Sequence, residues 1–330
     1  MMNEAQPPEN NRRAHGPGQF SLRRELVGIL CLLAALGLFC GLSLRVLTPK
    51  RQQYGSVWGM FSREPADSLD LLVMGSSLAY CDVVPAVLYE DTGLTSFVMA
   101  GPQQTMPITY YYLREALKTQ HPQVVALELT GMFFAPDNRH VKTNLTFMPY
   151  DFNRWAASFS ETRGEELLGL MFPLYAYHDR WDKLTRQDLT EGLWGQQADV
   201  LAGYTYLDQV TPAGAPSYRD DLDQDPAHYA RAAEYLEKLR DLCREENIVL
   251  RCFLSPAAET IPPELLEQLE GTVERLGLST VNYSARMEDL ALDWETDFFD
   301  LRHLNYRGAE KFTRLLGEDL TGEGLAPGKA

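Results

Sequence analysis

Two short stretches near opposite ends of the chain contain the residue types of a serine nucleophile and its base. The first is the apolar run 69–74, which ends at Gly75 and continues into Ser76 and Ser77. A buried parallel strand that ends in glycine presents the next small side chains at the carboxyl edge of a sheet, where open α/β folds bind ligands. The tight turn also aims backbone N–H groups into the same space, ready for an oxyanion.

The second stretch, residues 298–305, has Asp300 three positions before His303. A carboxylate at that spacing can orient an imidazole and fix its tautomer, which leaves the other ring nitrogen to take a proton from a serine. Asn305 follows as the expected N-cap of a last helix with one apolar face. We therefore expect His303 at the same rim as Ser77. Without that convergence, the two would be a turn serine and a solvated loop histidine.

The elements that must position these residues alternate between strand and helix patterns. Five short apolar runs have the composition of buried strands, at 70–74, 96–100, 124–129, 248–254 and 279–283. Helical patterns separate or follow them, at 85–91, 105–118, 226–247 and 262–276. This alternation predicts an α/β fold with a parallel sheet of about five strands and helices on both faces.

An aromatic-rich insertion interrupts the alternation from about residue 131 to about residue 225. Such a long excursion between sheet elements is typical of a functional cap. Within it, His178, Arg180 and Trp181 are the residue types of a sugar or acyl-donor subsite, so they are candidate substrate-binding residues. The alternative is that the rings form the core of the cap and that Arg180 pairs with an acid.

Residues 26–44 contain no charged side chain and would form a helix of about 28 Å, enough to cross a bilayer core. Four arginines precede this run and three basic residues follow it, a slight bias towards a cytoplasmic N-terminus. No small-residue cleavage site follows, so we expect an uncleaved single-pass anchor in the cell membrane. Residues 1–25 are then a disordered cytoplasmic tail, 45–68 a linker and 69–330 an extracytoplasmic domain.

Charge and cysteine content exclude several classes of function. The chain has a net charge of −16, divided into +4 over residues 1–51 and −20 over the remainder. Such an acidic body is a poor nucleic-acid binder, because phosphate neutralisation needs clustered Lys and Arg. The five cysteines form neither a Cys-x-x-Cys motif nor a Cys/His cluster, so we predict no metal and no cofactor. Cys243 and Cys252 could pair, or each could be a small buried side chain on a helix and a strand.

The two stretches resemble motifs of the SGNH, or GDSL-type, serine hydrolases. Residues 75–78 are similar to the Gly-Asp-Ser-Leu block with Ser in place of Asp, and residues 300–303 match the Asp-x-x-His block. The resemblance implies a flavodoxin-like three-layer sandwich with Ser77 as the nucleophile. It also implies that Gly101, after the second strand, shares the oxyanion hole with Ser77.

The third block of that family, whose Asn supplies another oxyanion donor, is not visible after the strand at 124–129. Thr130, Asn138 or Asn144 could substitute for that Asn, and the sequence does not choose among them.

Together with the N-terminal anchor, these motifs resemble the membrane-anchored branch that acts on bacterial cell-surface polymers, the DltD-like and alginate O-acetylation proteins. The resemblance implies a serine esterase or O-acyltransferase that acts on a cell-envelope polysaccharide or polymer through an acyl-enzyme. It also implies a membrane-bound O-acyltransferase as partner. One alternative is a catalytically silent accessory or binding protein that retains the scaffold. Another is an intracellular esterase without an anchor.

Overall fold

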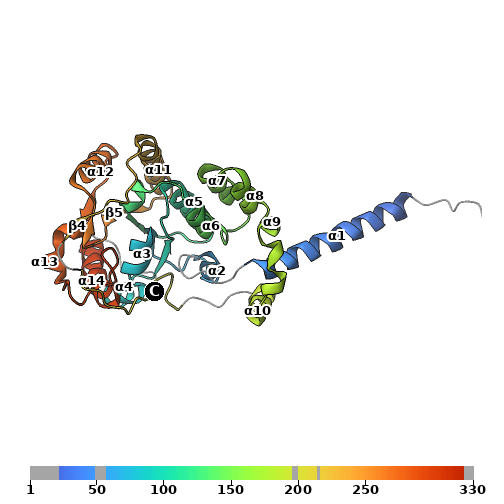
Figure 1. Cartoon of the computed structure of the whole chain (residues 1–330), viewed down its shortest axis with the longest axis horizontal. Helices are drawn as coiled ribbons and strands as arrows, with labels where there is room; N and C mark the ends of the chain where they lie inside the picture. Colours follow the sequence, from blue (N-terminus) through green and yellow to red (C-terminus); the bar gives the residue numbers. More distant parts are fainter. Residues whose placement is uncertain (1–21, 49–56, 195–199, 214–215, 323–330) are drawn as a thin grey trace, which may run out of the picture.

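The computed structural model describes residues 22–48, 57–194, 200–213 and 216–322 (Figure 1). Its centre is a five-stranded parallel sheet with the strand order β2-β1-β3-β5-β7. The strands are β1 (Leu71–Gly75), β2 (Ser96–Ala100), β3 (Val124–Glu128), β5 (Val249–Leu254) and β7 (Thr280–Asn282). Every residue of β1, β2 and β3 is buried, which explains why these strands are continuous apolar runs. The prediction of a parallel α/β fold is confirmed.

Helices cover both faces of the sheet, because alternate strand residues point to opposite sides. Leu72 and Met74 of β1 pack in the core that includes residues of α5 (Met106–Ala116), α11 (Pro226–Glu245) and α12 (Pro263–Arg275). Leu71 and Val73 pack in the second core, with residues of α3 (Ser77–Asp82), α4 (Pro85–Thr92) and α14 (Tyr306–Gly322). Two short elements, η3 (Tyr283–Arg286) and α13 (Met287–Leu290), precede α14. Figure 1 shows α11 and α12 on one side of the sheet and α4 and α14 on the other.

The predicted insertion is a set of short helices between β3 and α11, which we call the cap. It consists of η1 (Leu129–Phe133), α6 (Asn138–Leu145), α7 (Phe152–Glu161), α8 (Gly164–Met171), α9 (Pro173–Tyr177), η2 (His178–Lys183) and α10 (Arg186–Trp194). The chain then returns through β4 (Ser217–Tyr218), which pairs in parallel with β6 (Glu259–Thr260). This two-stranded pair was not predicted, because two residues are too few to show a period.

The N-terminal helix α1 (Leu22–Leu47) extends away from the body of the protein (Figure 1). It is long and apolar enough to cross a membrane, and none of its apolar window is buried, as expected of a membrane anchor or a signal sequence. Its end contacts α9, η2 and α10. Residues 1–21 of the predicted tail lie outside the described residues, while residues 22–25 begin this helix.

Part of the segment predicted as a linker, residues 45–68, belongs to the folded body. Residues 49–56 lie outside the described residues, but α2 (Trp58–Phe61) packs in the core. Trp58 and Phe61 make edge-to-face contacts with Tyr112 and Phe97. These two rings, three positions apart, share one face of a short helix, and their burial attaches the segment to the sheet.

All five cysteines are free. Cys243 on α11 and Cys252 on β5 are buried, as the alternative of two small apolar side chains predicts. Burial raises the pKa of each of these thiols to about 12. Burial, followed by the nearby charges of Asp82 and Asp300, also raises the pKa of Cys81 well above its ordinary value.

Gly75 closes β1 in a conformation that other residues rarely adopt. Its φ is +146°, and a Cβ added there would lie 2.7 Å from Cβ of Glu128. We therefore expect Gly75→Ala to lower the free energy of unfolding by about 2 kcal/mol or more. Gly271→Ala is the control, because Gly271 is exposed on α12 with nothing within 4 Å of the added Cβ. That change should stabilise the protein by about 0.5–1 kcal/mol. Equal effects in chemical denaturation would contradict the prediction.

Candidate active site

The turn after β1 gives its two serines different environments. Ser76 is the N-cap of α3 and is fully buried; its hydroxyl donates to Oε2 of Glu128 at 2.9 Å. Ser77 is the first residue of α3 and is half-buried. The backbone N–H at this first position has no partner within the helix itself. Ser76 is thus committed to the scaffold, while Ser77 presents its hydroxyl at the rim.

A tight loop before α14 holds the second stretch in place. Phe298 and Leu304 form an antiparallel bridge, and the N–H of Phe299 donates to the carbonyl of His303 at 2.9 Å. Asn305 caps α14, because its Oδ1 accepts from the N–H of Arg307 at 3.0 Å. The predicted N-cap is therefore confirmed, and the loop is closed at both ends.

The structure brings Ser77, His303 and Asp300 together. His303 Nε2 lies 2.8 Å from Ser77 Oγ, and His303 Nδ1 lies 2.9 Å and 3.0 Å from the two carboxylate oxygens of Asp300. A ring that donates from Nδ1 to a carboxylate keeps Nε2 as the acceptor of the serine proton. This is the hydrogen-bonded chain of a nucleophile, a general base and the acid that orients the base.

The environment of Asp300 keeps its carboxylate ionised. Partial burial raises the pKa of Asp300, but the hydrogen bond from His303, the charge of that ring and backbone N–H groups together lower it to about 2. Those N–H groups belong to Arg302 and His303 and donate to Oδ1 at 2.7 Å and 2.8 Å. The same oxygens thus orient the ring and fix the loop.

Ion pairs fasten this loop to the β4–β6 pair. Arg302 donates from Nε to Glu259 at 2.6 Å and from Nη1 to Asp221 at 2.8 Å. Asp221 also accepts two hydrogen bonds of 3.0 Å from Arg219. Arg302, next to His303, is therefore held both by β6 and by the segment that follows β4.

Two fully buried acids, Asp82 and Glu128, brace the same two loops. Glu128 accepts from Ser76 and from the N–H and hydroxyl of Thr130. Asp82 accepts from the N–H of Leu304 at 3.0 Å. Burial is the largest effect on both carboxyls and raises the pKa of each. Sequence reasoning missed both positioning residues; the only signal for Glu128 is an acid at the end of the apolar run 124–128.

Two candidates for the oxyanion hole lie against each other. Gly101 follows β2, and its N–H makes a long bond of 3.4 Å to the carbonyl of Gly75. Asn144 on α6 is buried with its side-chain amide packed directly on Gly101, where a Cβ would overlap it. Its Nδ2 donates to the carbonyl of Pro102 at 3.2 Å. Of the three Thr or Asn candidates, Asn144 is therefore the one in contact with Gly101.

The other two candidates are engaged elsewhere. Thr130 donates both its N–H and its hydroxyl to Glu128. Asn138 is exposed at the start of α6, and its Oδ1 accepts from the Thr162 hydroxyl at 3.1 Å. Neither contact directs a donor towards Ser77.

The three candidate substrate-binding residues of the cap lie near the end of α1. Arg180 donates to the carbonyl of Leu47 and pairs with Asp188 at 3.4 Å, as the alternative interpretation predicts for this arginine. His178 is exposed and lines a pocket inside the cap, and Trp181 is also exposed. None of the three lines the pocket beside the triad. The alternative that the rings form the core of the cap is also incomplete, because several of them are exposed.

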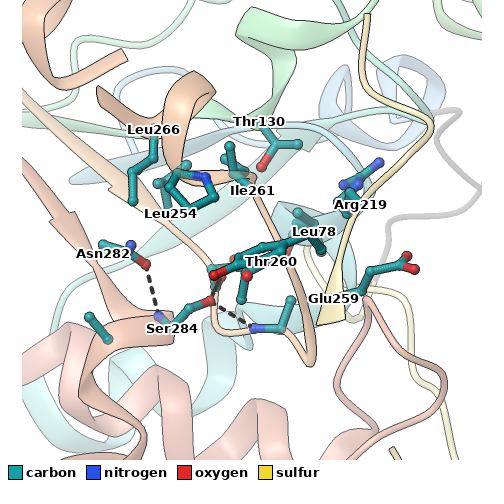
Figure 2. A pocket seen from close by; sticks show the side chains of 15 residues that line it. Leu78, Thr130, Arg219, Leu254, Glu259, Thr260, Ile261, Leu266, Asn282 and Ser284 are labelled. Atoms are coloured by element: carbon teal, nitrogen blue, oxygen red, sulfur yellow. Dashed lines mark hydrogen bonds between the residues drawn. The ribbon is translucent and has the colours of Figure 1, made fainter. Parts of the chain in front are cut away.

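Figure 2 shows a pocket of about 240 Å³. It adjoins both loops of the triad, because Leu78, which follows Ser77, and Glu259, which binds Arg302, line it. Figure 2 shows aliphatic Leu254 and Leu266 on one side and Arg219 with Glu259 on the other. Ser77 and His303 themselves are not among the residues that line it.

No protein-family model matches this chain, and no curated protein matches its sequence. Among residues 22–48, 57–194, 200–213 and 216–322, no group of three or more His, Cys, Asp or Glu side chains is placed to hold a metal ion.

The lowered pKa of Asp300 predicts a pH-dependent contribution to stability. A carboxylate whose pKa falls on folding stabilises the protein above its ordinary pKa, and the contribution is lost as the pH falls through the folded value of about 2. Because the side chain is 45 % exposed, solvent screening limits the contribution to about 1 kcal/mol. The native protein should have a higher free energy of unfolding than Asp300→Asn at neutral pH. Denaturation at decreasing pH should show this difference shrink by that amount. A difference that stays constant would contradict the assignment.

Proposed function

We propose that this protein is a membrane-anchored, extracytoplasmic serine esterase or O-acyltransferase of the SGNH type that acts on an acylated cell-envelope polysaccharide or polymer. The observation that carries the proposal is the chain of hydrogen bonds from Asp300 through His303 to Ser77. The strand order, with the nucleophile at the end of β1, supports a flavodoxin-like sandwich of that family. α1 supports the anchor. The proposed cytoplasmic N-terminus rests on the four basic residues before the apolar run against the three after it.

In the proposed reaction, Nε2 of His303 takes the proton of Ser77 as Oγ attacks the ester carbonyl. Asp300 stabilises the imidazolium that forms. The N–H of Ser77 and the second N–H of the Asn144 amide, whose nitrogen also donates to the carbonyl of Pro102, stabilise the oxyanion beside Gly101. When the tetrahedral intermediate collapses, the C–O bond to the alcohol breaks and His303 returns the proton to that alcohol. An acyl-serine remains.

The acyl-serine is resolved by the reverse sequence. His303 removes a proton from water in an esterase, or from a sugar hydroxyl in a transferase, and the attacking oxygen displaces Ser77. The alcohol must lie on the His303 side, and the pocket beside the Arg302 loop is suited to hold it. A membrane-bound O-acyltransferase partner would supply the acyl group on the same side of the membrane.

A fluorophosphonate probe on the full-length protein tests the nucleophile. Ser77→Ala should abolish labelling, and His303→Ala should slow it by at least about 10³-fold, because the serine loses its base. Ser76→Ala is the matched control, because this neighbouring hydroxyl is fully buried and donates to Glu128. It should retain labelling, at a lower rate because the turn loses its hydrogen bond to Glu128.

The absence of labelling, under conditions where a known serine esterase reacts, would favour the alternative of a catalytically silent accessory protein. One observation favours that alternative: the N–H of Gly101, a candidate oxyanion donor, is already bonded to the carbonyl of Gly75.

Asn144→Ala tests the oxyanion hole. Loss of one donor should lower kcat for ester hydrolysis by about 10²- to 10³-fold with little change in KM, because the interaction forms in the transition state. Asn138→Ala is the control on the same helix and should leave kcat unchanged. A rise in KM at constant kcat in Asn144→Ala would instead assign this residue to substrate binding.

A further inference from the structure

A set of large apolar side chains is exposed on one part of the cap. We call it the cap face, and it consists of residues on or directly before α9, η2 and α10: Phe172, Tyr175, Trp181, Leu189, Leu193 and Trp194. The two tryptophans are 73 % and 75 % exposed. Soluble surfaces rarely gather several large apolar side chains, so such a set indicates an interaction surface.

The elements that contain the cap face, α9, η2 and α10, contact α1, and Figure 1 shows α9 and α10 at the end of α1 next to the body. Arg180 donates to the carbonyl of Leu47, in the last turn of α1. Gly192 packs so closely on the same turn that a Cβ would lie 2.9 Å from the carbonyl oxygen of Arg45. Trp181 follows Arg180 in the sequence, and Trp194 lies two positions after Gly192. Both tryptophans are therefore anchored beside the polar end of the apolar helix.

The charges of this region do not favour a highly charged partner. Residues 172–194 contain three basic and four acidic side chains, and the chain after residue 51 has a net charge of −20. Electrostatic attraction to anionic lipid would therefore be weak or absent. Tryptophan and tyrosine rings, in contrast, prefer the boundary between acyl chains and headgroups because one end of the ring is apolar and the other is polar.

We propose that the cap face lies in the headgroup layer of the bilayer that α1 crosses, so that the cap rests on the lipid surface. The proposal depends on the anchor part of the proposed function and not on the catalytic part. The apolar stretch of α1 ends at residue 44 and its last turn contacts the cap. The residues in contact with that turn must then be at the depth of the headgroups. The occupant is lipid, held by apolar partition rather than by charge.

Tryptophan quenching in nanodiscs tests this placement. The full-length protein is incorporated into phosphatidylcholine nanodiscs with and without brominated acyl chains, which quench only nearby rings. α1 contains no tryptophan, so the anchor itself gives no signal. Trp181→Phe and Trp194→Phe should each remove part of the quenched fluorescence, and the double variant most of it. Trp155→Phe on α7 is the matched control, because that ring is also exposed but lies outside the cap face. It should leave the quenched component unchanged.

Four results would overturn the proposal. Quenching that persists in the double variant would place other rings in the lipid, and equal losses in all variants would show no preferred face. Cross-links between the α10 helices of two chains in one nanodisc would show that a second copy covers the surface. If the full chain fails to insert, both the anchor and the cap-face proposals fail, while fluorophosphonate labelling still decides the catalytic one. Circular dichroism of each variant checks that it is folded.

Discussion

The geometry of the whole rim depends on one hydrogen bond, the 2.8 Å contact between Nε2 of His303 and Oγ of Ser77. The two residues are 226 positions apart in the sequence, so the bond forms only if two separate loops are fixed to within a few tenths of an ångström. The strained glycine at the end of β1 fixes one loop. The Phe298–Leu304 bridge and the Asn305 cap fix the other.

Two carboxyls inside the protein reinforce this arrangement. A buried acid is costly unless it is hydrogen-bonded, so its partners are held firmly. Glu128 binds the turn of Ser77 through Ser76, and Asp82 binds the loop of His303 through the N–H of Leu304. The scaffold therefore uses one acid for each loop. Asp300, at the surface of the same cluster, is the acid that remains ionised and faces the ring.

The parts of the fold that could be predicted are those with long local patterns. The five strands of the sheet and the helices α4, α5, α11 and α12 lie within one or two residues of their predicted bounds, because runs such as 96–100 are buried on both faces. The anchor predicted at 26–44 extends three to four residues further at each end, as Leu22–Leu47. The helix at Trp58 was assigned to a linker because four residues do not reveal a period. Tertiary contacts alone determine the rest. Asn144 and Asn138 are equivalent candidates in the sequence, and only the contact of Asn144 with Gly101 distinguishes them.

The aromatic cluster of the cap illustrates the same limit at the level of function. A tryptophan beside an arginine has the same sequence pattern whether it faces a sugar, a core or a lipid. Only long-range contacts place such a segment, as the one between Arg180 and the end of α1 does for η2, and that contact joins residues 133 positions apart. In contrast, Asp300 and His303 were predictable as a pair because a separation of three residues lets both side chains act within one loop.

The free cysteines have a consequence for how the folded protein responds to its surroundings. The three in the body are buried and have raised thiol pKa values, so few thiolates exist to react with oxidants or with one another. Once the protein is folded, the redox state of its surroundings therefore has little effect on these three thiols.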